Sequence, residues 1–211
     1  MKKQKFCAAS AEIENEITKA LASFKKTWLS DEKVFEELCF CILTPQSSAN
    51  QALKTIELLK EHKILLKGSA KQKEKFLRSV RFYKTKAKRL EEAQKKFPKN
   101  RIKQILKQNG LPGAPLKCRE FLVREVNGYG MKEASHFLRN IGFGEEIAIL
   151  DRHILKNLVS CGVIESVPKT LPPKKYLEIE EKMKNFCMKH KIDFAELDLI
   201  FWSNETGKVL K

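Results

Sequence analysis

Residues 121–138 read FLVREVNGYGMKEASHFL, and this segment gives the clearest indication of the fold. Two apolar segments flank the turn NGYG at 127–130, where both glycines permit backbone conformations and close approaches that other residues do not. The pattern is typical of helix–hairpin–helix, which we place at residues 116–141. A helix start beside such a turn presents unpaired backbone N–H groups, so we expect a DNA phosphate to be bound by Asn127, Gly128 and Gly130. An ordinary tight corner between two helices is the alternative.

Apolar residues outside the hairpin also recur at three- and four-residue steps, the period of a helix. The first stripe runs from Ile13 to Trp28, and a second expected helix lies between Ser30 and Pro45. A third follows a serine cap at position 47 or 48. No stretch alternates apolar and polar residues as a strand does, so we expect an all-α fold of roughly ten helices. The further expected helices lie at about 70–80, 86–96, 100–108, 116–126, 131–141, 152–161, 173–189 and 193–204.

Two connectors rich in glycine and proline, residues 109–115 and 167–173, separate groups of expected helices. We expect the chain, residues 1–211, to form a single unit of two helical lobes. The expected lobes are residues 31–115 and, on the other side, residues 1–30 together with 116–211.

The chain is strongly basic, with 42 Lys and Arg residues against 26 Asp and Glu residues and a formal net charge of +16. Residues 61–120 contain 19 of the basic residues and 5 of the acidic ones, so a net charge of +14 lies in this one segment. Such a concentration suits neutralisation of DNA phosphates, which makes binding steeply salt-dependent. A solvated lysine-rich surface and a membrane-surface patch are the alternatives.

Other patterns argue against several classes of protein. The longest uncharged stretch, residues 38–53, is too short and too polar to span a bilayer. The basic start of the chain lacks the apolar core of a signal peptide, so we expect a cytoplasmic protein. The six cysteines form no C-x-x-C pair and no iron–sulfur spacing, which predicts reduced thiols and no metal site.

A lysine and an aspartate follow the hairpin. Lys132 lies in the first turn of the second hairpin helix, and Asp151 comes nineteen residues later, directly before the apolar-periodic segment 152–155. Taken singly, Lys132 also fits a surface lysine, and Asp151 also fits an ordinary N-cap. With both residues beside the hairpin, the sequence resembles the helix–hairpin–helix DNA glycosylase superfamily, in which a lysine at this place marks the bifunctional glycosylase/lyases.

Four further stretches, at residues 43–49, 80–87, 149–153 and 201–211, make the chain most similar to the short prokaryotic 8-oxoguanine DNA glycosylases of the second type. The resemblance implies a two-lobed glycosylase fold and excision of 8-oxoguanine. In the implied reaction, Lys132 forms an imine with the sugar, which permits β-elimination. Asp151 stabilises the positive charge that develops on the sugar.

The same resemblance implies roles for other residues. Phe82 and Trp202 are expected to sandwich the flipped base, and the terminal carboxylate of Lys211 is expected to accept hydrogen bonds from its guanine edge. Gln46 is expected near the estranged base. Core packing for Trp202 and helix capping for Gln46 are the alternatives. The expected DNA contacts outside the hairpin are Gln46, Arg152 and His153.

We therefore expect a monomer that acts on double-stranded DNA containing oxidised guanine or abasic sites, near the nucleoid of a prokaryotic-type cell, with no required cofactor. Two other functions stay open at this point. One is a lysine-dependent glycosylase/lyase for oxidised pyrimidines, which the missing iron–sulfur cysteines disfavour. The other is a non-catalytic helix–hairpin–helix module that binds DNA.

Overall fold

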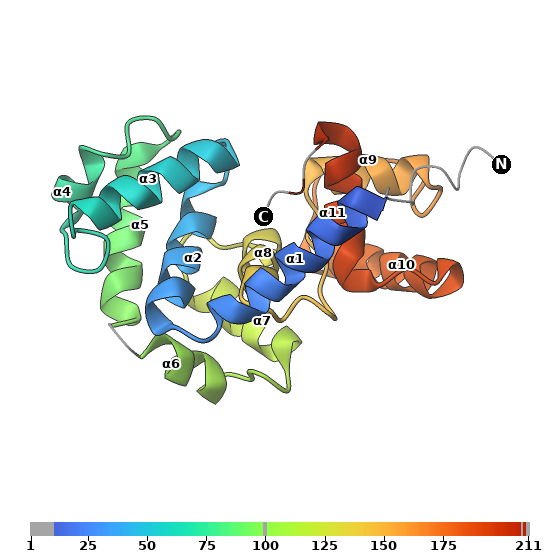
Figure 1. Ribbon diagram of the computed structural model, residues 1–211, viewed down its shortest axis with the longest axis horizontal. Coiled ribbons are helices and arrows are strands. Elements are labelled where there is room, and N and C mark those ends of the chain that lie inside the picture. The colour runs from blue at the N-terminus through green and yellow to red at the C-terminus, as the bar shows by residue number, and fades with distance from the viewer. Residues whose placement is uncertain (1–10, 99–100, 208, 210–211) are drawn as a thin grey trace.

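The computed structural model describes residues 11–98, 101–207 and 209, and within these ranges every regular element is an α-helix (Figure 1). The all-α prediction is confirmed. In this part of the chain the hairpin helices lie where they were expected, and none of the helices is long and apolar enough to cross a membrane. The helices are α1 (Ala11–Thr27), α2 (Asp31–Leu43), α3 (Ala49–Glu61), α4 (Ala70–Glu74), α5 (Tyr83–Lys96), α6 (Ile102–Gln108), α7 (Pro115–Glu125), α8 (Met131–Asn140), α9 (Arg152–Ser160), α10 (Pro173–His190) and α11 (Phe194–Thr206).

Capping serines and a first-turn proline, all visible in the sequence, fix the start of several helices. The Ser30 side chain accepts a hydrogen bond from the Lys33 N–H and caps α2. Ser48, not Ser47, caps α3, and it forms a reciprocal capping box with Gln51. Pro173 occupies the first turn of α10, where its missing N–H has no helical partner to lose.

The helix expected over 70–80 is much shorter than predicted, because α4 ends at Glu74. Tight turns follow it, in which the Leu77 N–H donates to the Glu74 carbonyl and the Val80 N–H donates to the Leu77 carbonyl. These turns bury Leu77 and Val80 in the core. The apolar spacing that predicts a helix is satisfied here by consecutive turns.

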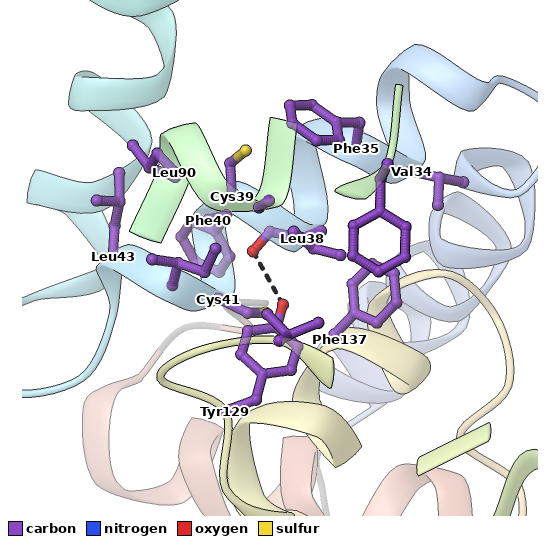
Figure 2. Packing of buried hydrophobic residues seen from close by; sticks show 14 of the residues in the cluster. Val34, Phe35, Leu38, Cys39, Phe40, Cys41, Leu43, Leu90, Tyr129 and Phe137 are labelled. Carbon is purple, nitrogen blue, oxygen red and sulfur yellow. Dashed lines mark hydrogen bonds between the residues drawn. The ribbon is translucent and has the colours of Figure 1, made fainter. Parts of the chain in front are cut away.

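Helix α2 lies at the centre of the largest of three hydrophobic clusters within the described ranges. It packs against α3, α5, α6 and α8, and nine of its thirteen residues are buried. Figure 2 shows the Tyr129 ring of the hairpin turn beneath α2, with its hydroxyl donating to the Leu38 carbonyl at 2.9 Å. Phe137 of α8 lies in the same cluster. The hairpin is therefore fixed to the core by buried side chains as well as by its own turn.

Three hydrophobic clusters organise the described residues. The first spans α2 to α8, the second joins the segment after α8 to α9, α10 and α11, and the third packs α1 against α11. Figure 1 shows α3 to α6 on one side, α9 to α11 on the other, and α1, α7 and α8 between them. These clusters group α7 and α8 with α2, whereas the expected lobes grouped them with α9 to α11. The lobe boundaries themselves stay a prediction.

Candidate active site

A cavity of about 250 Å³ opens where α8, α9 and α11 meet the turn between α2 and α3. Lys132 from α8 and Asp151 from the start of α9 both line it. So do two other residues that the sequence singled out, His153 and Trp202. The fold thus brings four of the predicted site residues to one cavity from positions up to seventy residues apart.

Lys132 is the second residue of α8, and its side chain is 28 % exposed. Its Nζ lies 3.0 Å from Oε1 of Glu133. The other carboxylate oxygen of Glu133 accepts from the Gly130 N–H at 3.2 Å, which caps α8. Glu133 therefore connects the hairpin turn to the lysine, and the lysine amine lies at the positive end of the helix.

Asp151 is the N-cap of α9. Its Oδ1 accepts from the Ile154 N–H at 2.8 Å, so the capping interpretation of this residue is correct. The same side chain lines the cavity, which leaves its carboxylate available to a ligand there. Both α8 and α9 begin at this cavity, and their N-terminal ends add positive potential to it.

A buried ion pair forms another wall of the cavity. Nη2 of Arg139 lies 3.1 Å from Oδ2 of Asp198, and both side chains are largely buried. Burial raises the pKa of the Asp198 carboxyl above its usual range, the Arg139 guanidinium opposes that rise, and the nearby charge of Asp151 adds to it. Arg139 also packs over the Phe24 ring, with its Cζ 4.7 Å from the ring centroid.

Trp202 of α11 and His153 in the first turn of α9 pack against each other. Their ring centroids are 5.2 Å apart in an edge-to-face arrangement. Nδ1 of His153 pairs with Glu205, which also accepts from Asn157 at 2.7 Å. Trp202 is partly buried and lines the cavity, so the structure gives it both a packing contact and access to a ligand.

The turn between α2 and α3 is held by a buried lysine. Lys86 of α5 donates to the carbonyls of Leu43 and Pro45, at 2.6 and 2.8 Å, and to the Ser47 hydroxyl at 3.0 Å. Burial lowers the pKa of Lys86 to about 8, and the like charge of Arg89 adds to that effect. Ser47 lines the cavity.

Two expected residues lie near this turn but do not line the cavity. Gln46 precedes Ser47 and has a left-handed backbone with φ of 56°. Phe82 is the N-cap residue of α5 and has φ of 57°; the residue is 54 % exposed, and Cζ of Arg81 lies 5.0 Å from the centroid of its ring. Phe82 is thus accessible from outside the protein, and its role in holding a base stays a prediction.

The hairpin turn and its surroundings form the expected phosphate-binding region. Asn127 donates to Glu92 at 3.1 Å. Gly128 has φ of 95°, a backbone conformation that is strained for residues with a side chain, so the turn favours glycine here. The Gly130 N–H already pairs with Glu133, and Arg152 is exposed at the start of α9. Their contacts with DNA stay predictions.

Sequence reasoning missed five polar residues of the cavity and included one that cannot be placed; the missed residues are Thr44, Ser47, His136, Arg139 and Asp198. His136 and Arg139 follow Lys132 by four and seven residues, so helical spacing alone could have put them on its face. No local signal in the sequence marks Thr44, Ser47 or Asp198 as part of the site. Lys211 lies outside the described residues. In the described part of the chain, no cluster of three or more His, Cys, Asp or Glu residues has the arrangement of a metal site.

Comparisons with known proteins identify the family. A family model described as 8-oxoguanine DNA glycosylase matches residues 17–192. The chain belongs to this family. A curated 8-oxoguanine DNA glycosylase/AP lyase from Fusobacterium nucleatum is 45 % identical over 205 residues, which cover 95 % of this chain and 93 % of that protein. The enzyme of the same name from Methanocaldococcus jannaschii is 38 % identical and covers 96 % of this chain.

Solved structures agree with this membership. The crystal structure of the M. jannaschii 8-oxoguanine DNA glycosylase has a TM-score of 0.85 with this chain and covers 95 % of it, at 38 % identity. The M. jannaschii glycosylase/lyase in complex with a 15mer DNA containing 8-oxoguanine has a TM-score of 0.84, at 37 % identity, and covers 95 % of this chain and 94 % of its own. The resemblance to helix–hairpin–helix glycosylases is thereby confirmed.

Proposed function

We propose that this chain excises 8-oxoguanine from double-stranded DNA and cleaves the resulting abasic site, with Lys132 as the nucleophile and Asp151 as the carboxylate that supports it. The activity agrees with the family and with relatives that cover nearly the whole chain. The observation that carries the two roles is that both side chains line one cavity, each at the start of a helix. A non-catalytic DNA-binding module has no need of this arrangement.

The chemistry follows from the two groups. The Lys132 amine attacks C1′ of the flipped nucleotide, the Nζ–C1′ bond forms, and the bond from C1′ to the base breaks with its electron pair leaving on the base. One proton from Nζ passes to the departing base, and transfer of the second Nζ proton to the ring oxygen O4′ opens the sugar ring and gives the imine. Removal of a proton from C2′ then expels the 3′ phosphate. The Asp151 carboxylate, fixed by the Ile154 N–H, stabilises the positive sugar and relays protons.

The surrounding residues bind the substrate in this proposal. Trp202 stacks on the extruded base, Phe82 closes on its other face, and Lys211 reads its guanine edge. Gln46 lies next to the gap in the duplex. The hairpin residues Asn127, Gly128 and Gly130, together with Arg152 and His153, bind phosphates.

The remaining expectations follow from this chemistry. Since an amine and a carboxylate supply both the nucleophile and the stabilising charge, we propose that catalysis requires no metal or prosthetic group. Full activity in the presence of EDTA is the expected result. We further propose a cytoplasmic location at the nucleoid, where the substrate DNA lies.

Borohydride trapping tests the nucleophile. Lys132→Gln should abolish covalent capture on a duplex with 8-oxoguanine, and strand cleavage with it, while binding of the damaged duplex changes little because the hairpin backbone is intact. The matched control is Lys182→Gln, which removes an exposed lysine on α10 that pairs with surface Glu178. That variant should trap like the wild type.

A panel of duplexes with single defined lesions separates the alternative functions. Excision of 8-oxoguanine with little excision of oxidised pyrimidines supports the proposal, and the opposite preference supports the pyrimidine enzyme. Binding without trapping of any lesion by the wild type identifies a DNA-binding module. Normal trapping by Lys132→Gln removes Lys132 from the mechanism.

A further inference from the structure

A buried polar network lies behind the cavity and joins four segments of the chain. At its centre is the ion pair of Arg119 on α7 and Glu180 on α10, in which the two guanidinium nitrogens lie 2.6 and 2.9 Å from the two carboxylate oxygens. Nη1 of Arg119 also donates to the Ser135 hydroxyl of α8 at 3.2 Å. All three side chains are almost completely buried.

The same network holds the segment that leads to Asp151. Oε1 of Glu180 accepts from the Ala148 N–H at 2.6 Å. The hydroxyl of Tyr176, four residues earlier on α10, donates to the Ala148 carbonyl at 2.6 Å and accepts from the Leu150 N–H at 3.2 Å. The backbone on both sides of residue 149 is thus fixed by two side chains of α10.

The network contacts both the helix that carries Lys132 and the backbone that leads to Asp151. Ser135 lies one helical turn after Lys132 on α8, and its hydroxyl lies 3.4 Å from the Tyr176 hydroxyl. Leu150 directly precedes Asp151. A chain of hydrogen bonds therefore runs from the helix that carries the lysine, through Tyr176, to the backbone that carries the aspartate.

We infer that Tyr176 and Glu180 of α10 are positioning residues that set the distance between Lys132 and Asp151, an inference that rests on the proposed function. Neither lines the cavity, so neither contacts the substrate. Their effect comes from geometry, because displacement of a catalytic group by about 1 Å can cost roughly a hundredfold in rate. A hydrophobic core at this place would bury the same helices without fixing the two backbones to each other.

The test uses Tyr176→Phe, which keeps the buried ring and removes only the hydroxyl. We expect the single-turnover rate of 8-oxoguanine excision to fall at least tenfold, and the cleavage rate of a pre-formed abasic site to fall with it. The Kd for damaged duplex should stay within about twofold of the wild type. Hydrogen exchange at the Leu150 amide should accelerate, because that N–H loses its acceptor.

The matched control is Thr55→Val on α3. It also removes a buried hydroxyl, which donates to the Gln51 carbonyl at 2.7 Å, but it lies away from the cavity. It should lower Tm by a similar amount and leave the excision rate unchanged. If Tyr176→Phe excises as fast as Thr55→Val while the wild type is active, the inference is overturned. A wild type that neither excises nor traps overturns the proposed function instead, and the inference falls with it.

Discussion

Asp151 combines a structural role with a proposed chemical one, and two substitutions separate them. Its Oδ1 caps α9 by accepting from Ile154. Asparagine retains such an oxygen and alanine does not, so Asp151→Ala should lose about 1 kcal/mol of stability, which lowers Tm by roughly 2–4 °C in a protein of this size. For Asp151→Asn, the loss of a favourable charge at the helix start is offset by relief of its repulsion with Asp198. The Tm of that variant should stay close to wild type.

Both variants lose the negative charge, and the proposed mechanism makes that the decisive change. The single-turnover rate of 8-oxoguanine excision should fall by about a hundredfold or more in each, because one preorganised electrostatic group is worth roughly 10²–10³ in rate. A matched control is Asp193→Ala, since Asp193 caps α11 by accepting from the Ala195 N–H at 2.9 Å and does not line the cavity. It should lose similar stability and keep its activity.

The decisive comparison is between Asp151→Asn and Asp151→Ala. Excision by the asparagine variant at close to the wild-type rate, with loss of activity only in the alanine variant, would refute the electrostatic role. Asp151 would then serve as a cap and nothing more. If both variants lose excision equally but only Asp151→Ala has a lower Tm, the loss of excision comes from the missing charge and not from the missing cap.

Three further predictions address other parts of the molecule. Burial lowers the pKa of Lys86 to about 8, so between pH 8 and about 10.5 the unfolded chain binds more protons than the native state. The contribution of Lys86 to the free energy of unfolding therefore rises with pH across that window, by about 3 kcal/mol. The difference in unfolding free energy between wild type and Lys86→Met, measured by urea titration, should therefore increase from pH 8 to pH 10, and a constant difference would contradict this. If residues 61–120 bind phosphates, a plot of log affinity for undamaged duplex against log salt should have a slope steeper than about −3, whereas a shallow slope would make these lysines a solvated surface. Asp198→Ala leaves the buried Arg139 charge unpaired and should cost about 3–5 kcal/mol in chemical denaturation, and a loss below about 1 kcal/mol would show that the pair contributes little to folding.

Much of this fold is local enough to be predicted from the sequence. Apolar spacing placed most helices, Ser30 and Pro173 marked two starts, and the glycines at 128 and 130 located the hairpin. The exception over 70–80 shows the limit of periodicity, since a series of tight turns buries Leu77 and Val80 as effectively as a helix does.

The candidate site was predictable where such local signals, or the family resemblance, pointed to a residue. Lys132 and Asp151 were singled out because each was expected at a helix start after the hairpin, in the pattern that resembles the glycosylase superfamily. The Arg139–Asp198 pair joins residues 59 positions apart, and the Lys86–Ser47 contact joins residues 39 apart. Helical spacing places Arg139 on the same face of α8 as Lys132, but nothing in the local sequence indicates that Arg139 pairs with Asp198 or that Lys86 binds Ser47. These pairings depend on tertiary packing.

The dual use of Asp151 explains why a residue so ordinary by local rules is difficult to assign from sequence. An aspartate before an apolar helix is what folding alone requires, and a fixed, ionised carboxylate at that place is what the proposed chemistry requires. The hydrogen bond from Ile154 serves both, because it caps the helix and also orients the second carboxylate oxygen. The helix start thus supplies preorganisation at no additional cost in stability. A substitution that preserves the cap but removes the charge, such as Asp151→Asn, therefore tests the chemical role of the carboxylate alone.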